Sequence, residues 1–573
     1  MAEPARRWIP PAIAGIAFAV VALVFVLPYL ANELRFPLGW DSPFYVWRTG
    51  AVGVDGLDRI GGVRPATPLL FNALAGLTGS DSFTVAAIGP ALLAAVAGLA
   101  AAGLLRASHD IGPWWVPPMA VLAWIGFGHP GMVREQPDNV LNAALFLGAL
   151  AAAVAYVRWG RGWWAVALLL TGAGLAHWPF FVLAAGVVIL AAAAFAGRGL
   201  ISPGRDEETR RARNLIGAAG AAGGAVGAAL LWRPATAWTT PQLQTLMEIL
   251  RERFLRRAGD PHRLPVLPLA GAGLALASRR RDRPERRMFF LLMLVWIGLT
   301  AIGAALQAAG VPTAGLRLLN HLFPLTLLVG VLVWWIGTRL GTRGAVAAAA
   351  VTLVGFGALA IPFQLGGRPW YEPAAVRQIA SAGAWLEANA PGTPVVITVG
   401  TVGDVLTRER RRNTILASLP PEVARRTSVS DRPSARLFVA VSAYDQRGYD
   451  LLRHIGREIA PGVAAGGTEL GTEPVGPLLD GPLADTDPWT VSVVVILGGV
   501  ALFAAGLGWA VALLPQDPVL RWTLAPALGA AVATLIGVAW AAAEIPLDGP
   551  AGAGPLAVSA VAGAGVAFGR SRG

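Results

Sequence analysis

The amino-acid sequence predicts a polytopic α-helical membrane protein that carries a small α/β domain outside the membrane. Three observations support this fold class. The 573 residues are 55% hydrophobic and only 14% charged, and their mean hydropathy is +0.58. Apolar stretches of about 20 residues recur, each long enough to cross a hydrocarbon core of roughly 30 Å. Only the segment from Arg368 to Asp487 combines short strand-like runs with helical patterns.

Hydropathy predicts about fourteen membrane-spanning helices. The first follows Arg6 and Arg7, and its apolar run from Ile9 to about Leu30 is too long for the h-region of a signal peptide. We therefore expect this helix to be retained. The predicted spans cover residues 9–31, 83–106, 113–129, 139–157, 162–177, 179–197, 214–232, 263–278, 288–308, 320–337, 344–363, 489–514, 522–543 and 553–569.

The arginines set the expected orientation in the plasma membrane. With both termini in the cytoplasm, every inner connection between spans carries arginine, as the positive-inside rule requires. One basic segment, residues 251–257, falls in an outer loop of this topology. The net charge of +12 is therefore mostly loop charge. Nucleic-acid binding is excluded as a function because the arginines form no compact basic domain.

The predicted α/β domain lies between the last two groups of spans. Residues 394–399 and 437–441 have the pattern of strands, and residues 374–389 and 449–458 have that of helices. Residues 461–482 are rich in Gly and Pro, which predicts a linker back to the bilayer. The expected domains are a membrane core at 1–365, the α/β domain with its linker at 366–487, and a C-terminal three-helix membrane segment at 488–573.

Asp41 is the first candidate for chemistry. It follows the first span within the motif Trp40-Asp41-Ser42-Pro43, on the predicted outer side. A carboxylate held at the membrane surface can act as a general base for a hydroxyl group. The same motif is typical of a helix start, with Asp41 or Ser42 as the N-cap and Pro43 in the first turn. Both interpretations remain open.

A second acidic motif, Arg134-Glu135-Gln136-Pro137-Asp138-Asn139, stands at an outer end as well. If this segment is helical, a spacing of three places Glu135 and Asp138 on one face. Two carboxylates near Asp41 could bind a divalent cation such as Mg²⁺ or Mn²⁺, which prefers oxygen ligands. Alternatively, Asp138 caps the following helix and Glu135 pairs with Arg134.

Arginines in two outer segments are candidates for binding phosphate. Arg317 precedes His321 by four residues at the outer end of a predicted span. The basic segment contributes Arg253, Arg256 and Arg257. Guanidinium groups bind phosphate bidentately, but arginines at an interface also extend toward lipid headgroups.

Histidines and aromatic residues also gather at the predicted outer side. His129, His177, His262 and His321 all fall at outer ends, where imidazoles could bind metal or transfer protons. Trp40, Tyr45 and Trp47 could stack on a sugar ring, or they could form an aromatic belt at the interface.

Taken together, these motifs resemble the GT-C glycosyltransferases, integral membrane enzymes that use polyprenyl-phosphate-linked sugars. The resemblance covers roughly residues 1–400 and lies in Gly39-Trp40-Asp41-Ser42-Pro43, in Glu135 and Asp138, and in Gly315-Leu316-Arg317-Leu318-Leu319-Asn320-His321-Leu322-Phe323-Pro324. It implies a GT-C-like core in which Asp41 is the catalytic base. Arg317, with Arg253, Arg256 and Arg257, would bind the donor phosphate, and Glu135, Asp138 and His321 would lie near the acceptor or a metal.

The predicted function is an extracytoplasmic hexosyl- or pentosyltransferase that inverts the transferred sugar. Its donor would be a polyprenyl-phosphate sugar, and its acceptor a cell-envelope glycan or lipid. Two alternatives remain. A flippase or transporter of lipid-linked sugars is one, although transport usually needs ionisable groups or broken helices near the midplane, and the span centres here are nearly bare of charge. The other is a non-catalytic envelope-assembly protein on the same scaffold.

Overall fold

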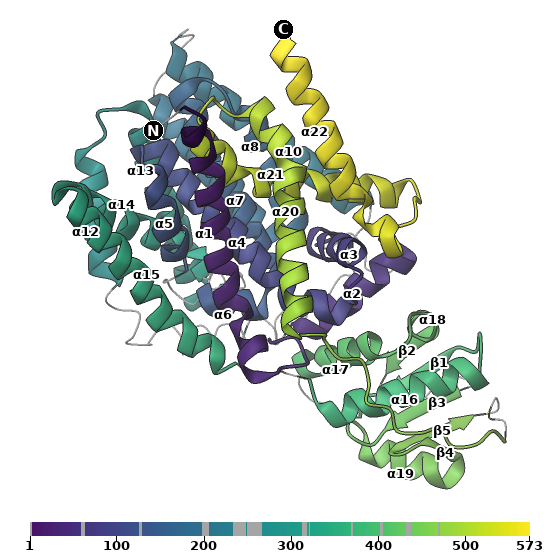
Figure 1. Cartoon of the computed structure of the whole chain (residues 1–573). Helices are drawn as coiled ribbons and strands as arrows, with labels where there is room; N and C mark the ends of the chain where they lie inside the picture. Colours follow the sequence, from purple (N-terminus) through teal and green to yellow (C-terminus); the bar gives the residue numbers. More distant parts are fainter. Residues whose placement is uncertain are drawn as a thin grey trace.

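A computed structural model shows a helical body with an α/β domain attached to one end (Figure 1). The structure describes residues 3–39, 41–58, 64–124, 129–197, 206–232, 248, 266–311, 318–319, 321–367, 369, 371–400, 405–430, 437–467, 470 and 472–572. The predicted fold class, a polytopic helical membrane protein with a small α/β domain, is confirmed.

Ten helices in the described part of the chain are long and apolar enough to cross a membrane. Three shorter apolar helices, α8 (Trp163–Ala176), α12 (Val266–Arg279) and α14 (Phe323–Arg339), also coincide with predicted spans. The exact number of spans stays a prediction. The long helices are α1 (Glu3–Asn32), α4 (Ser82–His109), α7 (Pro137–Trp159), α9 (Trp178–Ala196), α10 (Glu207–Trp232), α13 (Pro284–Ala308), α15 (Gly341–Leu365), α20 (Pro488–Leu513), α21 (Pro518–Ala542) and α22 (Gly554–Arg572), the last preceded by the 3-10 turn η5 (Gly549–Ala553).

The segment between α4 and α7 differs from the single span predicted at 113–129. It contains a 3-10 turn η1 (Pro113–Trp115), a short helix α5 (Val116–Leu122) and a second short helix α6 (His129–Glu135). Prolines stand in the first turns of η1 and α5, where a proline is tolerated because its missing N–H would have no helical partner. Two further helices, α2 (Ser42–Asp55) and α3 (Ala66–Thr78), lie between α1 and α4. The start of α2 is the helix start that one interpretation of the Asp41-Ser42-Pro43 motif predicted, whereas α3 was not predicted.

The helical body has two chemically different ends. At one end, Arg106 pairs with Asp517 at 2.7 Å and Arg158 lies 3.5 Å from Asp110. We call this the arginine end; both chain termini lie there (Figure 1). The opposite end adjoins the α/β domain, and there the hydroxyl of Thr84 accepts a hydrogen bond from the backbone of Asp485. We call it the domain end.

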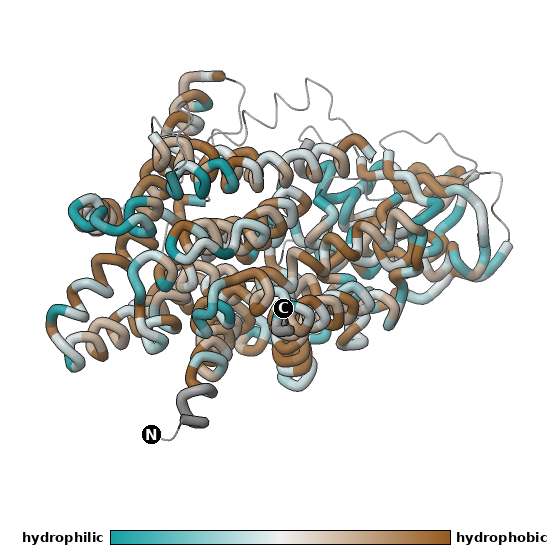
Figure 2. The backbone as a smooth tube through the Cα atoms, turned by 90° about the horizontal axis from the view of Figure 1, so that it is seen from above, coloured by the Kyte–Doolittle hydropathy of each residue, from teal (hydrophilic) through white to brown (hydrophobic). Residues whose placement is uncertain are grey.

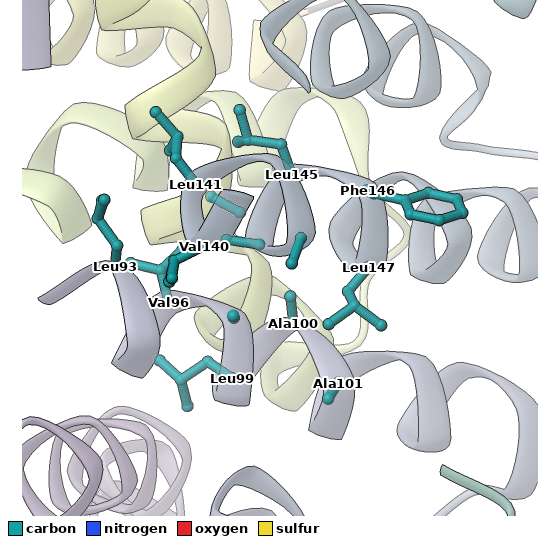
Figure 3. Close-up of a cluster of buried hydrophobic side chains, with 14 of the residues drawn as sticks. Leu93, Val96, Leu99, Ala100, Ala101, Val140, Leu141, Leu145, Phe146 and Leu147 are labelled. Atoms are coloured by element: carbon teal, nitrogen blue, oxygen red, sulfur yellow. The ribbon is translucent and has the colours of Figure 1, made fainter. Parts of the chain in front are cut away.

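Helices α4 and α7 form the centre of the helical body. The most apolar window of each is entirely buried. Figure 3 shows Ala100 and Ala101 of α4 among larger side chains such as Leu147 of α7. Small residues let the backbones of membrane helices approach closely, and packing rather than hydrophobicity then holds the helices together. The tube in Figure 2 is correspondingly hydrophobic along most of the helical body.

The α/β domain is built on a five-stranded sheet in the order β2-β1-β3-β5-β4. The first three of these strands are parallel, and β5 and β4 are antiparallel to their neighbours. The strands predicted at 394–399 and 437–441 and both predicted helices are confirmed. The elements are α16 (Pro373–Asn389), β1 (Val395–Thr398), α17 (Val405–Ser418), α18 (Pro421–Arg426), β2 (Thr427–Ser430), β3 (Leu437–Val441), α19 (Gln446–Ile455), β4 (Arg457–Ala460) and β5 (Val463–Gly467).

The predicted linker begins later in the structure than residue 461, because β5 occupies its first part. The described residues from 472 to 487 then follow an extended path back to the helical body. The backbone N–H of Ala484 donates to the carbonyl of Arg35, and the hydroxyl of Thr486 donates to that of Leu34. The linker is therefore fastened to the chain just after α1, at the domain end.

Candidate functional site

Asp41 lies at the start of α2, at the domain end. Its carbonyl accepts hydrogen bonds from the backbone N–H groups of Phe44 and Tyr45, which begin the helix. Its carboxylate makes no capping hydrogen bond to the helix. The position therefore matches the predicted N-cap, whereas the side chain does not perform the chemistry of a cap.

A close backbone contact brings Asp41 to the second acidic motif. Gly39 has a φ of +108°, and a Cβ atom there would overlap the carbonyl oxygen of Arg134 and approach the Cα of Glu135 to 2.8 Å. Only glycine tolerates both this φ and this proximity without strain. The loop before α2 and the end of α6 are thus held against each other, although they are far apart in the sequence.

Asp138 is buried in the first turn of α7, with a side chain that is 2% exposed. Its Oδ2 accepts a hydrogen bond from Arg64 Nη1 at 2.8 Å, and His177 Nε2 lies 3.8 Å from the same oxygen. Its Oδ1 accepts the backbone N–H of Asn139 at 2.9 Å. The N-cap of α7 is Gln136 rather than Asp138, so Asp138 does not cap the helix as one interpretation predicted. It is instead the anion of a buried ion pair in the first turn.

Tyr45 and Arg48, on the buried face of α2, complete what we call the buried charge cluster: Tyr45, Arg48, Arg64, Asp138 and His177. Burial, and then the charges of Asp138 and Asp41, raise the pKa of the Tyr45 hydroxyl well above its ordinary value. The carboxylate of Asp41 therefore lies within electrostatic reach of the buried charge cluster.

The two arginines of the buried charge cluster differ in how well their charges are compensated. Burial lowers the pKa of Arg64, but Asp138, Tyr45 and Asp41 together outweigh this effect and the net pKa is raised. Burial, followed by repulsion from Arg64, lowers the pKa of Arg48 to about 9. The guanidinium of Arg48 also lies 4.4 Å from the centre of the Phe44 ring. Arg48 is thus a strongly desolvated cation that a further anion would stabilise.

His321 is connected to this cluster through aromatic contacts. Its buried ring stacks on Phe180 with centroids 3.8 Å apart, and Phe180 in turn lies 4.5 Å from the ring of His177. The structure therefore brings together three predicted site residues, Asp41, Asp138 and His321, from the starts of different helices. The predicted phosphate-binding residues Arg317, Arg253, Arg256 and Arg257 lie outside the described residues.

Glu135 does not share a helical face with Asp138. It ends α6, α7 begins at Pro137, and the backbone of Gln136 between them is not helical, with φ −142° and ψ 69°. The condition for a common face, a continuous helix, is therefore not met, and Pro137 is the reason, because a proline disfavours a helical residue before it. Arg134 extends away to the Phe363 carbonyl at 3.3 Å.

Among the described residues there is no group of three acidic or histidine side chains that could bind the predicted divalent cation. Asp138 has both oxygens engaged, by Arg64 and by the N–H of Asn139. The positive charge beside this carboxylate is thus already supplied by a guanidinium. These residues do not fit the binding of Mg²⁺ or Mn²⁺, whose site stays a prediction.

Sequence reasoning missed Arg48 and Arg64. Their signal was present, because both are arginines on the predicted outer side, where the positive-inside rule disfavours them. His177 and Tyr45 were noted, but as ends of spans and as interfacial aromatic residues. Nothing in the sequence indicates that these four side chains face one carboxylate.

A cavity of about 500 Å³ separates α2 from the α/β domain. Trp47 of α2 lines one side, and Arg408 and Arg412 of α17 line the other, together with Ser428 and Ser430 of β2. Arg425 fastens the domain beside it through an ion pair of 2.7 Å with Asp55. The cavity therefore lies between the helix that carries Tyr45 and Arg48 and the polar edge of the sheet.

No family model and no curated protein matches this chain. Among solved structures, the chain is similar to the apo oligosaccharyltransferase of Archaeoglobus fulgidus, with 13% identity and a TM-score of 0.44 over 73% of this chain and 64% of that one. It is also similar to ArnT of Cupriavidus metallidurans bound to undecaprenyl phosphate, with 14% identity and a TM-score of 0.44 over 80% of this chain and 99% of that one.

The chain thus spans less than two thirds of the oligosaccharyltransferase and nearly all of ArnT. Both are GT-C membrane glycosyltransferases, the superfamily that the sequence resembles. A likeness of this size assigns no activity and no residue, so the function must be argued from the side chains of this chain.

Proposed function

We propose that this protein is an extracytoplasmic glycosyltransferase of the plasma membrane, which moves a sugar from a polyprenyl-phosphate donor to a cell-envelope glycan or lipid. The observation that carries the proposal is the proximity of Asp41 to the buried charge cluster at one end of the helical body. Paired, buried ionisable groups are expensive to maintain, and they gather where charge develops during a reaction.

Asp41 acts as the general base in this proposal. It accepts the proton of the acceptor hydroxyl while that oxygen attacks the anomeric carbon of the donor. The bond between that carbon and the phosphate oxygen breaks, and the polyprenyl phosphate leaves with the bonding electron pair. Attack opposite to the leaving group inverts the anomeric carbon. The position of Asp41 at the start of α2, in a loop that packs against the end of α6, supports this role.

Arg48 and Arg64 receive the phosphate of the donor. Arg48 is charged in a buried place beside another cation, and an anionic ligand removes that penalty. Asp138 keeps Arg64 in position through the 2.8 Å hydrogen bond. Arg317, Arg253, Arg256 and Arg257 keep their predicted role as additional phosphate ligands. Each step uses the chain's own side chains, and none depends on a metal ion.

The acceptor occupies the cavity between α2 and the α/β domain. Its volume of about 500 Å³ suits one or two sugar rings. Trp47 offers an aromatic face to a ring, and Ser428 and Ser430 offer hydroxyl groups. Trp47 lies on α2, the helix whose buried face carries Tyr45 and Arg48, so the proposed acceptor cavity adjoins an element of the buried charge cluster.

The test is transfer by the purified full chain in nanodiscs. The chain is supplied with polyprenyl-phosphate sugars, and loss of sugar from the lipid is measured for the wild type, for Asp41→Asn and for Asp58→Asn. The last is a control for an exposed acid in the same outer segment. We expect Asp41→Asn to lower turnover by about 10²–10⁴-fold, the usual contribution of a general base, and Asp58→Asn to leave it unchanged.

Two other outcomes would replace the proposal. Movement of lipid-linked sugar across a vesicle bilayer without loss of sugar would make the protein a flippase. If the wild type and Asp41→Asn both bound the lipid but neither transferred its sugar nor moved it across a bilayer, the protein would be a non-catalytic assembly protein.

A further inference from the structure

A second cavity, of about 560 Å³, lies at the arginine end, far from the α/β domain. It is formed where α8 and α21 begin and α20 and α22 end. Three arginines line it: Arg161 before α8, Arg521 in α21 and Arg570 in α22. The three come from separate parts of the sequence, so folding rather than a local run of charge brings them together.

The end of α20 holds two of these arginines in position. Arg570 donates a hydrogen bond to the carbonyl of Ala512, and Arg521 donates to the carbonyls of Val511 and Leu514 at 3.3 and 3.5 Å. The last carbonyls of a helix lack partners within it, so they are natural acceptors. Each guanidinium has five N–H donors. These bonds therefore fix the arginines and leave further donors for a ligand.

The charge of this cavity is not balanced by acids. None of the described residues that line it is Asp or Glu. Asp517, one turn before Arg521, uses one oxygen for the backbone N–H of Leu520 and the other for Arg106. Arg161 lies close enough to Arg521 for their charges to repel. An anion that enters the cavity would relieve this repulsion.

The rest of the lining is aromatic and apolar. The rings of Trp163 and Trp164 stack with centroids 3.9 Å apart, and Trp164 is 53% exposed. Val511 and Leu513 line the same cavity. Tryptophans at the ends of spanning helices mark the headgroup level of a bilayer. A ligand of this cavity therefore has an anionic head and meets apolar surface beside it.

We propose that this cavity binds the headgroup of an anionic phospholipid in the leaflet at the arginine end. Three cations suit a lipid that carries two phosphodiesters, such as cardiolipin, better than a lipid that carries one. The lipid joins the C-terminal helices α20, α21 and α22 to α8 of the preceding core. This site is independent of the function proposed above and would exist in an inactive protein.

The test compares lipid binding by the full chain and by single variants. The wild type, Arg161→Gln, Arg521→Gln and Arg570→Gln are purified in detergent, and retained lipid is measured by native mass spectrometry after addition of cardiolipin or phosphatidylcholine. Arg343→Gln, an exposed arginine at the same end but outside the cavity, is the matched control. We expect each cavity variant to weaken cardiolipin binding about fivefold, and Arg343→Gln to have no effect.

Arg161→Gln is the decisive variant, because this exposed side chain does not hold the end of α20. Equal binding by Arg161→Gln and Arg343→Gln would overturn the proposal. Equal retention of phosphatidylcholine and cardiolipin would overturn it too. Inorganic pyrophosphate is the third probe. If it displaced cardiolipin at equal concentration, the cavity would be a site for soluble phosphates rather than for lipid.

Discussion

The two ends of the helical body carry charge in opposite ways. At the domain end, Asp138 is 2% exposed and pairs with Arg64 at 2.8 Å. At the arginine end, Asp110 is 50% exposed and is shared by Arg106 and Arg158 at 2.9 and 3.5 Å. Water screens the exposed ions, whereas buried ions depend entirely on their neighbours. The buried ion pair of Asp138 and Arg64 at the domain end therefore costs desolvation energy. We infer that it is kept because it takes part in the proposed sugar transfer.

Most of the charge at the arginine end carries less of this cost. Arg106 pairs with the buried Asp517 at 2.7 Å, but Arg158, Arg521 and Arg570 bind backbone carbonyls or an exposed acid. The described residues that line the cavity include no acid. Arginines arranged in this way can attract anionic lipid headgroups. They also agree with the predicted orientation, in which this end faces the cytoplasm. The difference between buried, paired charge and exposed, unbalanced charge can be tested by parallel substitutions at the two ends.

The largest difference is expected for the acids. Asp138→Asn leaves Arg64 without its buried counter-ion and should lower the free energy of unfolding by about 3–5 kcal/mol. Asp110→Asn removes an exposed partner and should cost less than about 1 kcal/mol. Denaturation of both variants in mixed micelles measures the two losses. The double variant Asp138→Asn/Arg64→Gln should recover part of the stability but no transferase activity. Equal losses from the two single variants would contradict the comparison.

The next difference is expected for glycines. Gly39→Ala combines a φ of +108° with an overlap against Arg134, whereas Gly341→Ala, at the arginine end, has a φ of +72° and open space around its Cβ. We expect Gly341→Ala to cost about 1–2 kcal/mol, the price of a left-handed backbone, and Gly39→Ala to cost more. Gly39→Ala should also lower turnover, because it separates Asp41 from the second acidic motif. Thermal unfolding measures the loss of stability, and the transfer assay measures turnover. Similar losses for both variants would contradict the prediction.

The long apolar helices, and the position of both acidic motifs at one end of the helical body, could be predicted from the sequence, because apolar length and arginine position follow from the bilayer itself. The side of the membrane that this end faces stays a prediction. The start of α7 at Pro137 lies close to the predicted start of a span at residue 139, because a proline favours the first turn of a helix. The strand β5 was taken for linker, since its Ala and Gly residues lack the branched side chains of a typical strand.

The candidate site was predictable only in part. Asp41, Asp138 and His321 were found because each stands at the end of an apolar run. The contact of Arg64 with Asp138 joins residues 74 positions apart, and no local pattern encodes such a pairing. The same holds for Phe180, which links His177 to His321 through two ring contacts. Long-range packing, rather than any motif, determines which charges meet.

A smaller difference is expected for tryptophans. Trp47→Ala removes an aromatic wall of the cavity at the domain end and should raise the KM for the acceptor about tenfold, with little change in kcat. Trp114→Ala, at the arginine end, removes a ring that is 71% exposed and should change neither constant. Steady-state kinetics with varied acceptor measure both. A fall in kcat without a change in KM would place Trp47 outside the acceptor cavity.

The smallest effect is expected from removing divalent cations. If the guanidinium of Arg64 supplies the positive charge beside Asp138, a chelator should leave turnover unchanged, whereas Arg64→Gln should lower it. Both arms use the same transfer assay, with the chelator removed by dialysis before a second measurement. Loss of activity on chelation that added Mg²⁺ or Mn²⁺ restores would instead support a cation at Glu135 and Asp138. In that case Arg64 would hold Asp138 in place for the metal ion. The domain end would then contain two kinds of positive charge, a guanidinium and a bound cation.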